Sequence, residues 1–286
     1  MPQSRFTLID VFAARPLEGN LLAVVEDADE IDEATMATIA RRLRLSETSF
    51  IQTATSPTAT YRHRIFIVEG EIPFAGHPSL GTAAVWTHRR GLAEVDLVQQ
   101  TISGEQRLRV KMVGGSGIVA LWQNPANFGP VVEPGPLLAA LGLPESATHS
   151  ALQAQVVSTG LPTLVLPVAD VDALAQVNTE WEAFAGAMAV PGELKPIGCY
   201  LVAETGTGAW RARMFSTSVT GGEDPATGSA AGPFGAYLKE HTGLTKLAVK
   251  QGVEMGCPSE LRVETSDGIV VSGDVHIIGE GVLTLP

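Results

Sequence analysis

Three side chains that could move a proton stand at distinctive places in the sequence. Glu47 lies in the run LSET that begins at Leu45, and His77 and Asp224 each come directly before a proline and a series of small residues. A carboxylate can take a proton from carbon, and an imidazole or a carboxylic acid can return one or polarise the substrate. We therefore treat the three as candidate catalytic residues. Each also has a structural alternative, because a lone glutamate is usually solvated and Asp is a common helix cap.

The surroundings of His77 and Asp224 are repeated. Residues 77–84 read HPSLGTAA and residues 224–231 read DPATGSAA. A side-chain acceptor followed by proline and small residues predicts a helix that begins at the proline. We expect one helix from Pro78 to about Arg90 and another from Pro225 to about His241.

Small residues at these two helix starts leave backbone N–H groups uncovered, and the helix dipole adds partial positive charge there. An anion could bind at such a place. We therefore predict that an anion binds near Gly76, Gly228 and Ser229, beside the two candidate caps. Two capped core helices without a ligand are the alternative.

Further matches indicate that the chain contains an internal duplication. YRHRIF at residues 61–66 resembles WRARMF at 210–215, and Gly19-Asn20 followed by an apolar run resembles the segment that begins at Gly160. In the same alignment Gly198 stands at the place of Glu47. We predict an N-terminal lobe of residues 1–115, completed by residues 266–286, and a C-terminal lobe of residues 120–265.

Many short β-branched or alternating runs surround one strongly apolar helix in each half. This pattern predicts an α+β protein in which each lobe is a curved, barrel-like sheet around a central helix. The second of these helices is almost entirely apolar or small up to Ala236, which indicates burial on all sides.

Composition limits the partners. The net charge is −12 at pH 7, and this acidity argues against nucleic acid or an anionic membrane as a partner. Neither the two cysteines nor the histidines show metal-ligand spacing, and no glycine-rich nucleotide motif follows a strand. We therefore expect no metal or cofactor. Because no leader or membrane-spanning segment is apparent, we expect the protein to be cytoplasmic.

Several motifs together resemble the PhzF-like family, named for a phenazine-biosynthesis isomerase. They are distributed along the whole chain: DVF at 10–12, GN at 19–20, LSET at 45–48, PFAGHP at 73–78 and EDPATGSAAGP at 223–233. Two departures stand out. Leu21 replaces the usual proline after Gly-Asn, and Cys257 stands where an arginine is common.

The resemblance implies the diaminopimelate-epimerase-like fold, with two lobes and an active site in the cleft between them. It implies that Glu47 is the acid/base that moves a proton without a cofactor. It also implies that His77 and Asp224 act with Glu47, and that Asn20, Ser46, Gly76, Gly228 and Ser229 bind substrate. The paired cysteines of related racemases have no counterpart, because Pro78 and Pro225 occupy those places.

We therefore expect a homodimeric isomerase that moves a proton on a small anionic, unsaturated or cyclic carboxylic acid. A single base can take a proton from one position and return it at another, whereas a racemase needs groups on both faces of the carbon. An epimerase or dehydratase outcome, and a small-molecule-binding protein without turnover, are the alternatives.

Overall fold

The computed structural model describes residues 3–219 and 221–285, and the chain forms two compact units. Unit 1 consists of the residues up to Trp122 together with those from Ser272 onward, and unit 2 is Gln123–Val271. Among the described residues, no helix is long and apolar enough to cross a membrane.

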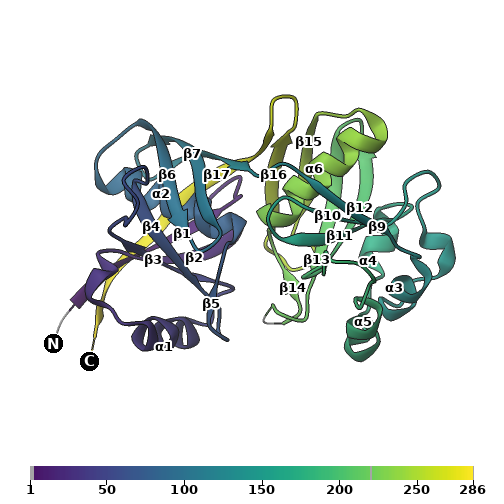
Figure 1. The fold of residues 1–286 in the computed structure, drawn as a ribbon, viewed down its shortest axis with the longest axis horizontal. Helices are drawn as coiled ribbons and strands as arrows, with labels where there is room; N and C mark the ends of the chain where they lie inside the picture. The colour runs from purple at the N-terminus through teal and green to yellow at the C-terminus, as the bar shows by residue number, and fades with distance from the viewer. Residues whose placement is uncertain (1–2, 220, 286) are drawn as a thin grey trace. The chain divides into compact units, whose positions relative to one another are not determined.

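Within its described residues unit 1 contains nine strands, and eight of them close into a barrel around one helix (Figure 1). Its strands are β1 (Gln3–Val11), β2 (Asn20–Val25), β3 (Thr48–Gln52), β4 (Tyr61–Phe66), β5 (Glu71–Ile72), β6 (Glu94–Thr101), β7 (Gly104–Val113) and β8 (Ser116–Gln123), with the later part of β17 (Ile269–Thr284). Its helices are η1 (Ala28–Glu30), α1 (Glu33–Leu43) and α2 (Gly76–Arg89).

The pairing closes this barrel through the last strand of the chain. β2 and β3 are parallel, β4 and β6 are parallel, and the remaining neighbours of the ring are antiparallel where their register is described. β17 pairs with β8 on one side and with β1 on the other, where Gln3 lies opposite Thr284. The short β5 adds to β4 outside the ring.

Unit 2 repeats the order of pairings seen in unit 1. Its strands are β9 (Asn127–Val131), β10 (Gln155–Ser158), β11 (Pro162–Pro167), β12 (Cys199–Gly206), β13 (Ala209–Phe215), β14 (Glu223–Asp224), β15 (Lys246–Gln251), β16 (Ser259–Glu264) and the beginning of β17. Its helices are α3 (Gly135–Ala140), η2 (Glu145–Ala147), α4 (Val171–Ala175), α5 (Trp181–Ala187) and α6 (Gly228–Thr242). β11 and β12 are parallel, β13 and β15 are parallel, and β14 adds to β13.

One helix in each unit is enclosed by the sheet. Residues Gly76–Val85 of α2 and Gly228–Leu238 of α6 are all buried. The packing is close at Gly81, where an added Cβ would lie 2.6 Å from the Leu22 side chain. This arrangement confirms the predicted α+β class with two barrel-like lobes around central helices.

The exact starts of these helices differ from the prediction. α2 begins at Gly76, so Pro78 lies in its first turn, where a missing N–H is tolerated. α6 begins at Gly228, because Asp224 still pairs with Met214 as part of β14. The two repeated segments, residues 77–84 and 224–231, therefore do not superpose residue by residue. Counted from the helix starts, Gly76 matches Gly228, and His77 matches Ser229.

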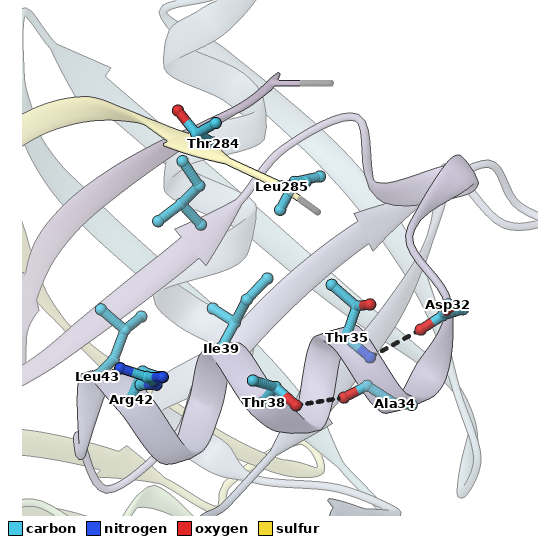
Figure 2. A pocket seen from close by; sticks show the side chains of 10 residues that line it. Asp32, Ala34, Thr35, Thr38, Ile39, Arg42, Leu43, Thr284 and Leu285 are labelled. Carbon is cyan, nitrogen blue, oxygen red and sulfur yellow. Dashed lines mark hydrogen bonds between the residues drawn. The ribbon is translucent and has the colours of Figure 1, made fainter. Parts of the chain in front are cut away.

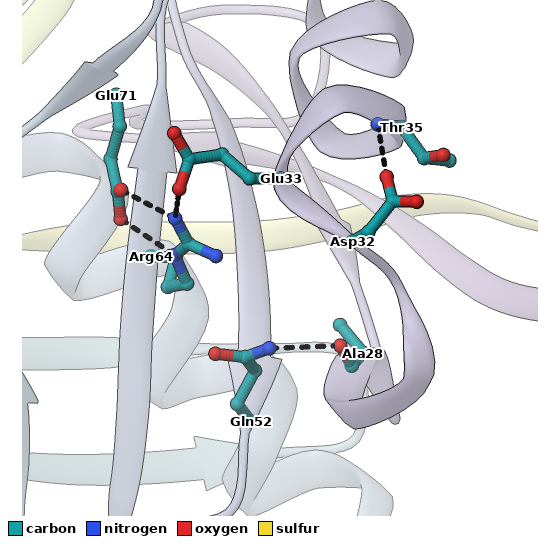
Figure 3. A network of polar contacts seen from close by, with 7 residues as sticks. All are labelled: Ala28, Asp32, Glu33, Thr35, Gln52, Arg64 and Glu71. Carbon is teal, nitrogen blue, oxygen red and sulfur yellow. Dashed lines mark hydrogen bonds and ion pairs between the residues drawn. The ribbon is translucent and has the colours of Figure 1, made fainter.

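Both units place an arginine–glutamate pair beside the short strand that leads to the helix. Arg64 on β4 makes two bonds of 2.7 and 2.6 Å to Glu71, and Figure 3 shows Glu33 reaching the same guanidinium. Arg213 on β13 makes two bonds of 2.7 Å to Glu223. Such two-pronged pairs fix geometry as well as charge. Each pair therefore ties β5 or β14 to the barrel.

Candidate active site

Five predicted site residues come together in unit 1, and one of them, Gly76, is the first residue of α2. Asn20 is the first residue of β2, Ser46 and Glu47 immediately precede β3, and His77 lies in the first turn of α2. The parallel pairing of β2 with β3, in which Ala23 lies opposite Thr48, brings the beginnings of these strands to the same end of the barrel. The site thus joins two strand starts and one helix start.

The turn before Asn20 depends on glycine. Gly19 has φ +77°, a left-handed conformation that other residues rarely adopt. A Cβ there would lie 2.4 Å from the carbonyl oxygen of Val11. Gly19 therefore allows the chain to return closely onto β1 and to present Asn20.

A chain of hydrogen bonds fixes the tautomer of His77. The Asn20 side chain is oriented with Oδ1 toward the Ser46 hydroxyl at 3.0 Å and its amide nitrogen toward His77 Nδ1 at 3.2 Å. The Glu47 carboxylate beside Nε2 favours this orientation, because it favours a proton on Nε2. The amide NH₂ can only donate, so Nδ1 accepts and Nε2 carries the proton of the neutral ring. Within the described part of the chain, Nε2 has no hydrogen-bond partner and lies 3.5 Å from Glu47 Oε2.

His77 is neutral at physiological pH. Its side chain is 3% exposed, and burial, followed by the nearby His63, lowers its pKa to about 3. A neutral Nε2–H is a hydrogen-bond donor that stays in place across the physiological range. His77 therefore has the form of a hydrogen-bond donor beside the Glu47 carboxylate.

Glu47 is partly accessible, with 16% of its side chain exposed. A distance of 3.5 Å to His77 is long for a hydrogen bond, and catalytic contacts often tighten only when substrate binds. The register of unit 2 places Gly198 immediately before β12, as Glu47 precedes β3. The two units therefore differ in carrying a carboxylate at this point.

The predicted residues of unit 2 form a second set. Asp224 is 7% exposed, and its Oδ2 accepts a short bond from the Thr227 hydroxyl. The fully buried Gln251 donates to the Asp224 carbonyl over 2.7 Å and to Thr227 Oγ1 over 2.9 Å. Asp224 is thus held just before the start of α6.

Gly228 and Ser229 open α6. The Gly228 carbonyl accepts from the Gln123 amide over 2.9 Å, and Thr159 in turn donates to Gln123. Ser229 is 7% exposed. Neither α2 nor α6 has a side-chain bond from its N-cap residue, Ala75 or Thr227. Both helix starts therefore retain the dipole that favours an anion.

The sequence did not predict the buried residues whose hydrogen bonds hold the predicted site residues of each unit in place. In unit 1 they are Ser49, His63 and Gln99, and in unit 2 they are Tyr200 and Gln251. The available signal was a glutamine near the end of an otherwise alternating strand, at Gln99 and Gln251, since a buried polar side chain must find partners.

A pocket of about 450 Å³ lies elsewhere on unit 1, between α1 and the end of β17. Figure 2 shows Ile39 and Leu43 of α1 facing it, with Leu285 on the opposite side. The site residues Asn20, Glu47 and His77 do not line it. Among the described residues, no group of three or more His, Cys, Asp or Glu could hold a metal ion.

The two departures from the family pattern fall in different settings. Leu21 lies in β2 opposite Asp10 and is half-buried, so it fills a strand position. Cys257 closes a turn by donating its N–H to the Gly252 carbonyl. An added Cβ at Gly252 would lie 2.6 Å from the Pro225 carbonyl oxygen, so this turn packs against the residue after Asp224.

Comparison with known proteins gives matches along the whole chain. A trans-2,3-dihydro-3-hydroxyanthranilate isomerase from Pseudomonas fluorescens is 33% identical over 98% of this chain and 99% of its own length. The structure of a predicted epimerase from Pseudomonas aeruginosa superposes with a TM-score of 0.86 at 34% identity, covering 99% of this chain and all of that one. A PhzF-family protein from Bacillus anthracis gives 0.84 at 25% identity over the full length of both chains.

The family model described as phenazine biosynthesis-like protein matches residues 9–285. Full-length relatives in this family are named as isomerases. The expected resemblance and the expected enzyme class are thus confirmed. The chain belongs to the phenazine biosynthesis-like PhzC-PhzF family and is an isomerase of the PhzF type.

Proposed function

We propose that this isomerase moves a proton within a small anionic carboxylic acid, unsaturated or cyclic, without a cofactor. The observation that carries the proposal is the chain from Ser46 through Asn20 to His77, which presents a neutral Nε2–H next to the Glu47 carboxylate. A base and a hydrogen-bond donor side by side are what proton transfer at carbon requires.

Glu47 is assigned the chemical step. Its carboxylate takes a proton from one carbon, the electron pair shifts into the adjoining double bond, and the same proton returns to a different carbon. The double bond moves and no atom is gained or lost. Gly198 at the matching place of unit 2 supports a single-base mechanism rather than a two-base racemisation.

His77 and Asp224 are assigned supporting roles. The Nε2–H of His77 would donate to an oxygen or nitrogen of the substrate as charge develops there. Asp224, held by Thr227 and Gln251, would bind a cationic or hydroxyl group of the same substrate. Asn20 and Ser46 hold the imidazole and complete the wall of this site.

The substrate carboxylate is assigned to the two helix starts. Gly76 and His77 open α2, and Gly228 and Ser229 open α6. The support is that both helix starts combine small residues with an N-cap residue whose side chain makes no capping bond.

Trans-2,3-dihydro-3-hydroxyanthranilate is the first compound to test, because the Pseudomonas fluorescens relative is named for it. Turnover would be followed by NMR in deuterated water. Some of the original hydrogen should reach the product, because a single carboxylate can return the proton before it exchanges with solvent. His77→Asn and Asp224→Asn should each lower the rate less than loss of Glu47.

Two outcomes would change the proposal. Complete deuteration with inversion at one carbon would indicate an epimerase, and loss of water from the substrate would indicate a dehydratase. If carboxylates stabilise the protein in a thermal-shift screen and none is turned over, the chain is a small-molecule-binding protein.

Two further expectations belong to this proposal. We propose a homodimer in the cytoplasm, with no nucleic acid or membrane as partner. Light scattering during size-exclusion chromatography measures the mass directly, and a monomer at micromolar concentration would contradict the dimer.

A further inference from the structure

A second histidine of unit 1 is buried directly behind the candidate site. His63 lies on β4 and is 2% exposed. Its ring contacts the strand that follows Glu47, the helix that carries His77, and β6. The hydroxyls of Ser49 and Thr82 and the amide of Gln99 surround it, and all three residues are fully buried.

The hydrogen-bond network around Gln99 fixes the proton on His63. The Ser79 hydroxyl donates to the Ala75 carbonyl, so it must accept from the Gln99 amide nitrogen over 2.8 Å. The Gln99 oxygen therefore faces His63 Nδ1 at 3.0 Å, and Nδ1 must donate. The amide orientation follows from these partners.

His63 Nε2 is consequently an acceptor. The Ser49 hydroxyl lies 2.8 Å from it and the Thr82 hydroxyl 3.2 Å. The His63 tautomer is thus opposite to that of His77, whose Nε2 carries the proton. Burial lowers the pKa of His63 to about 4, so the ring stays neutral and keeps this acceptor at physiological pH.

This acceptor joins the two pieces of chain that carry the reacting pair. Ser49 is two residues beyond Glu47 on β3. Thr82 lies in α2, whose first turn contains His77, and Ser79 of the same helix is held through Gln99. The strand and the helix are therefore linked through one imidazole nitrogen.

We propose that His63 is a positioning residue that holds Glu47 and His77 at their working separation by accepting hydrogen bonds from Ser49 and Thr82 at once. The proposal concerns the site assigned above and rests on its proposed function for the effect on rate. The geometric part stands independently, because the state of His77 can be observed in the protein without substrate.

The first measurement is the pair of tautomers. The chain has six histidines, and ¹⁵N labelling of their rings distinguishes a protonated from an unprotonated nitrogen in each. His63→Gln assigns the His63 signals. We expect protonated Nδ1 at His63 and protonated Nε2 at His77 at pH 7. Protonated Nε2 at His63 would overturn the proposal, because that nitrogen could not accept.

The second measurement uses a matched pair of variants on one helix. Thr82→Val removes a hydroxyl that binds His63. Thr87→Val removes an equally buried hydroxyl near the end of the same helix, which donates to the Ala83 carbonyl and, within the described residues, does not contact His63. We expect Thr82→Val to shift the His77 ring signals and Thr87→Val to leave them unchanged. The proposal would be overturned if the His77 ring signals of Thr82→Val were the same as those of Thr87→Val.

The third measurement is kinetic. Misplacement of a base by a fraction of an ångström lowers kcat, and we expect a loss of about tenfold for Thr82→Val with little change in KM. His63→Gln, which can still donate and accept, should keep more activity than His63→Leu. If the protein turns over none of the tested acids, the proposed function fails while the ring signals still decide the role of His63.

Discussion

The two units brace the start of the buried helix in different ways. In unit 1, Ser49 and Gln99 are linked through the His63 ring. In unit 2 the registers place Tyr200 at the position of Ser49 and Ala212 at that of His63. The Tyr200 hydroxyl reaches Gln251 directly over 3.0 Å, and the small Ala212 leaves room for the larger ring.

The difference shows how a duplicated fold acquires distinct chemistry. Each arrangement satisfies a fully buried glutamine, but the two glutamines differ in register. Val249 stands at the position of Gln99, and Gln251 stands at that of Thr101. Burial raises the pKa of Tyr200, so the phenol remains neutral. Only unit 1 combines an imidazole brace with a carboxylate before the neighbouring strand. The asymmetry is therefore concentrated where we assign proton transfer.

The strongest test of this asymmetry is Glu47→Gln. The amide keeps the size of the side chain and removes the base, so we expect turnover to fall by about 10² to 10⁴. Ligand binding and the circular dichroism spectrum should be retained. Glu26→Gln is the control, because Glu26 is a buried carboxyl of the same unit that bonds Thr7 and Arg89. Near-normal turnover in Glu47→Gln would disprove the assignment.

The next test compares the two arginine–glutamate pairs. Arg213→Met leaves Glu223 and the Leu174 carbonyl without the guanidinium, and we expect a loss of about 3 kcal/mol in the free energy of unfolding. Arg64→Met should cost about 1 kcal/mol less, since its additional partner Glu33 is 72% exposed and contributes little.

Urea denaturation of both variants measures this difference. The slope of the unfolding free energy against urea must stay the same for the comparison to hold. A larger loss for Arg64→Met would mean that the exposed Glu33 contact matters more than the bond to the Leu174 carbonyl.

A third test transfers the brace of unit 2 into unit 1. His63→Ala alone leaves the Gln99 oxygen unsatisfied and opens a cavity. Adding Ser49→Tyr should refill this cavity with the phenol ring, so we expect a favourable coupling of about 1 kcal/mol in a double-mutant cycle. Additive losses would show that the two arrangements are not interchangeable.

The smallest expected effect is the acid response of His63. Its folded pKa of about 4 lies below the unfolded value of 6.5, so the unfolded chain binds a proton first as the pH falls. The histidine therefore lowers stability below pH 6.5 and has no effect well above it. At pH 5.5 we expect a loss of about 1.4 kcal/mol relative to pH 7.5.

His63→Gln should lack this part of the acid response. The difference in unfolding free energy between wild type and variant should thus narrow, or reverse in sign, as the pH falls from 7.5 to 5.5. Taking the difference removes the contribution of the carboxylates that both proteins share. A constant difference would show that folding does not shift the pKa of His63.

Local patterns were sufficient for the architecture. The short alternating strands and the helix made almost entirely of apolar or small residues up to Ala236 predict the barrels. A helix that is buried on all sides has no face on which polar residues are favoured. The alignment of Glu47 with Gly198 also agrees with the strand registers.

Sequence patterns did not predict the exact helix starts or the hydrogen-bond partners of the buried polar residues. An acidic residue before proline looks like a cap, but Asp224 is held in β14 by its pairing with Met214 and by Gln251, which lies far along the chain. His63 likewise gains its partners from β3, β6 and α2. Such contacts depend on tertiary packing, which a single sequence does not specify residue by residue.

The pairing of β1 with β17 affects how the chain can be made. Gln3 lies opposite Thr284, so β1 gains one of its two neighbours only after the whole of unit 2 has been synthesised. Unit 2 is continuous from Gln123 to Val271 and can fold while that edge of β1 is still open. We therefore expect unit 1 to close last during translation, and C-terminal truncations to expose an unpaired strand edge that promotes aggregation.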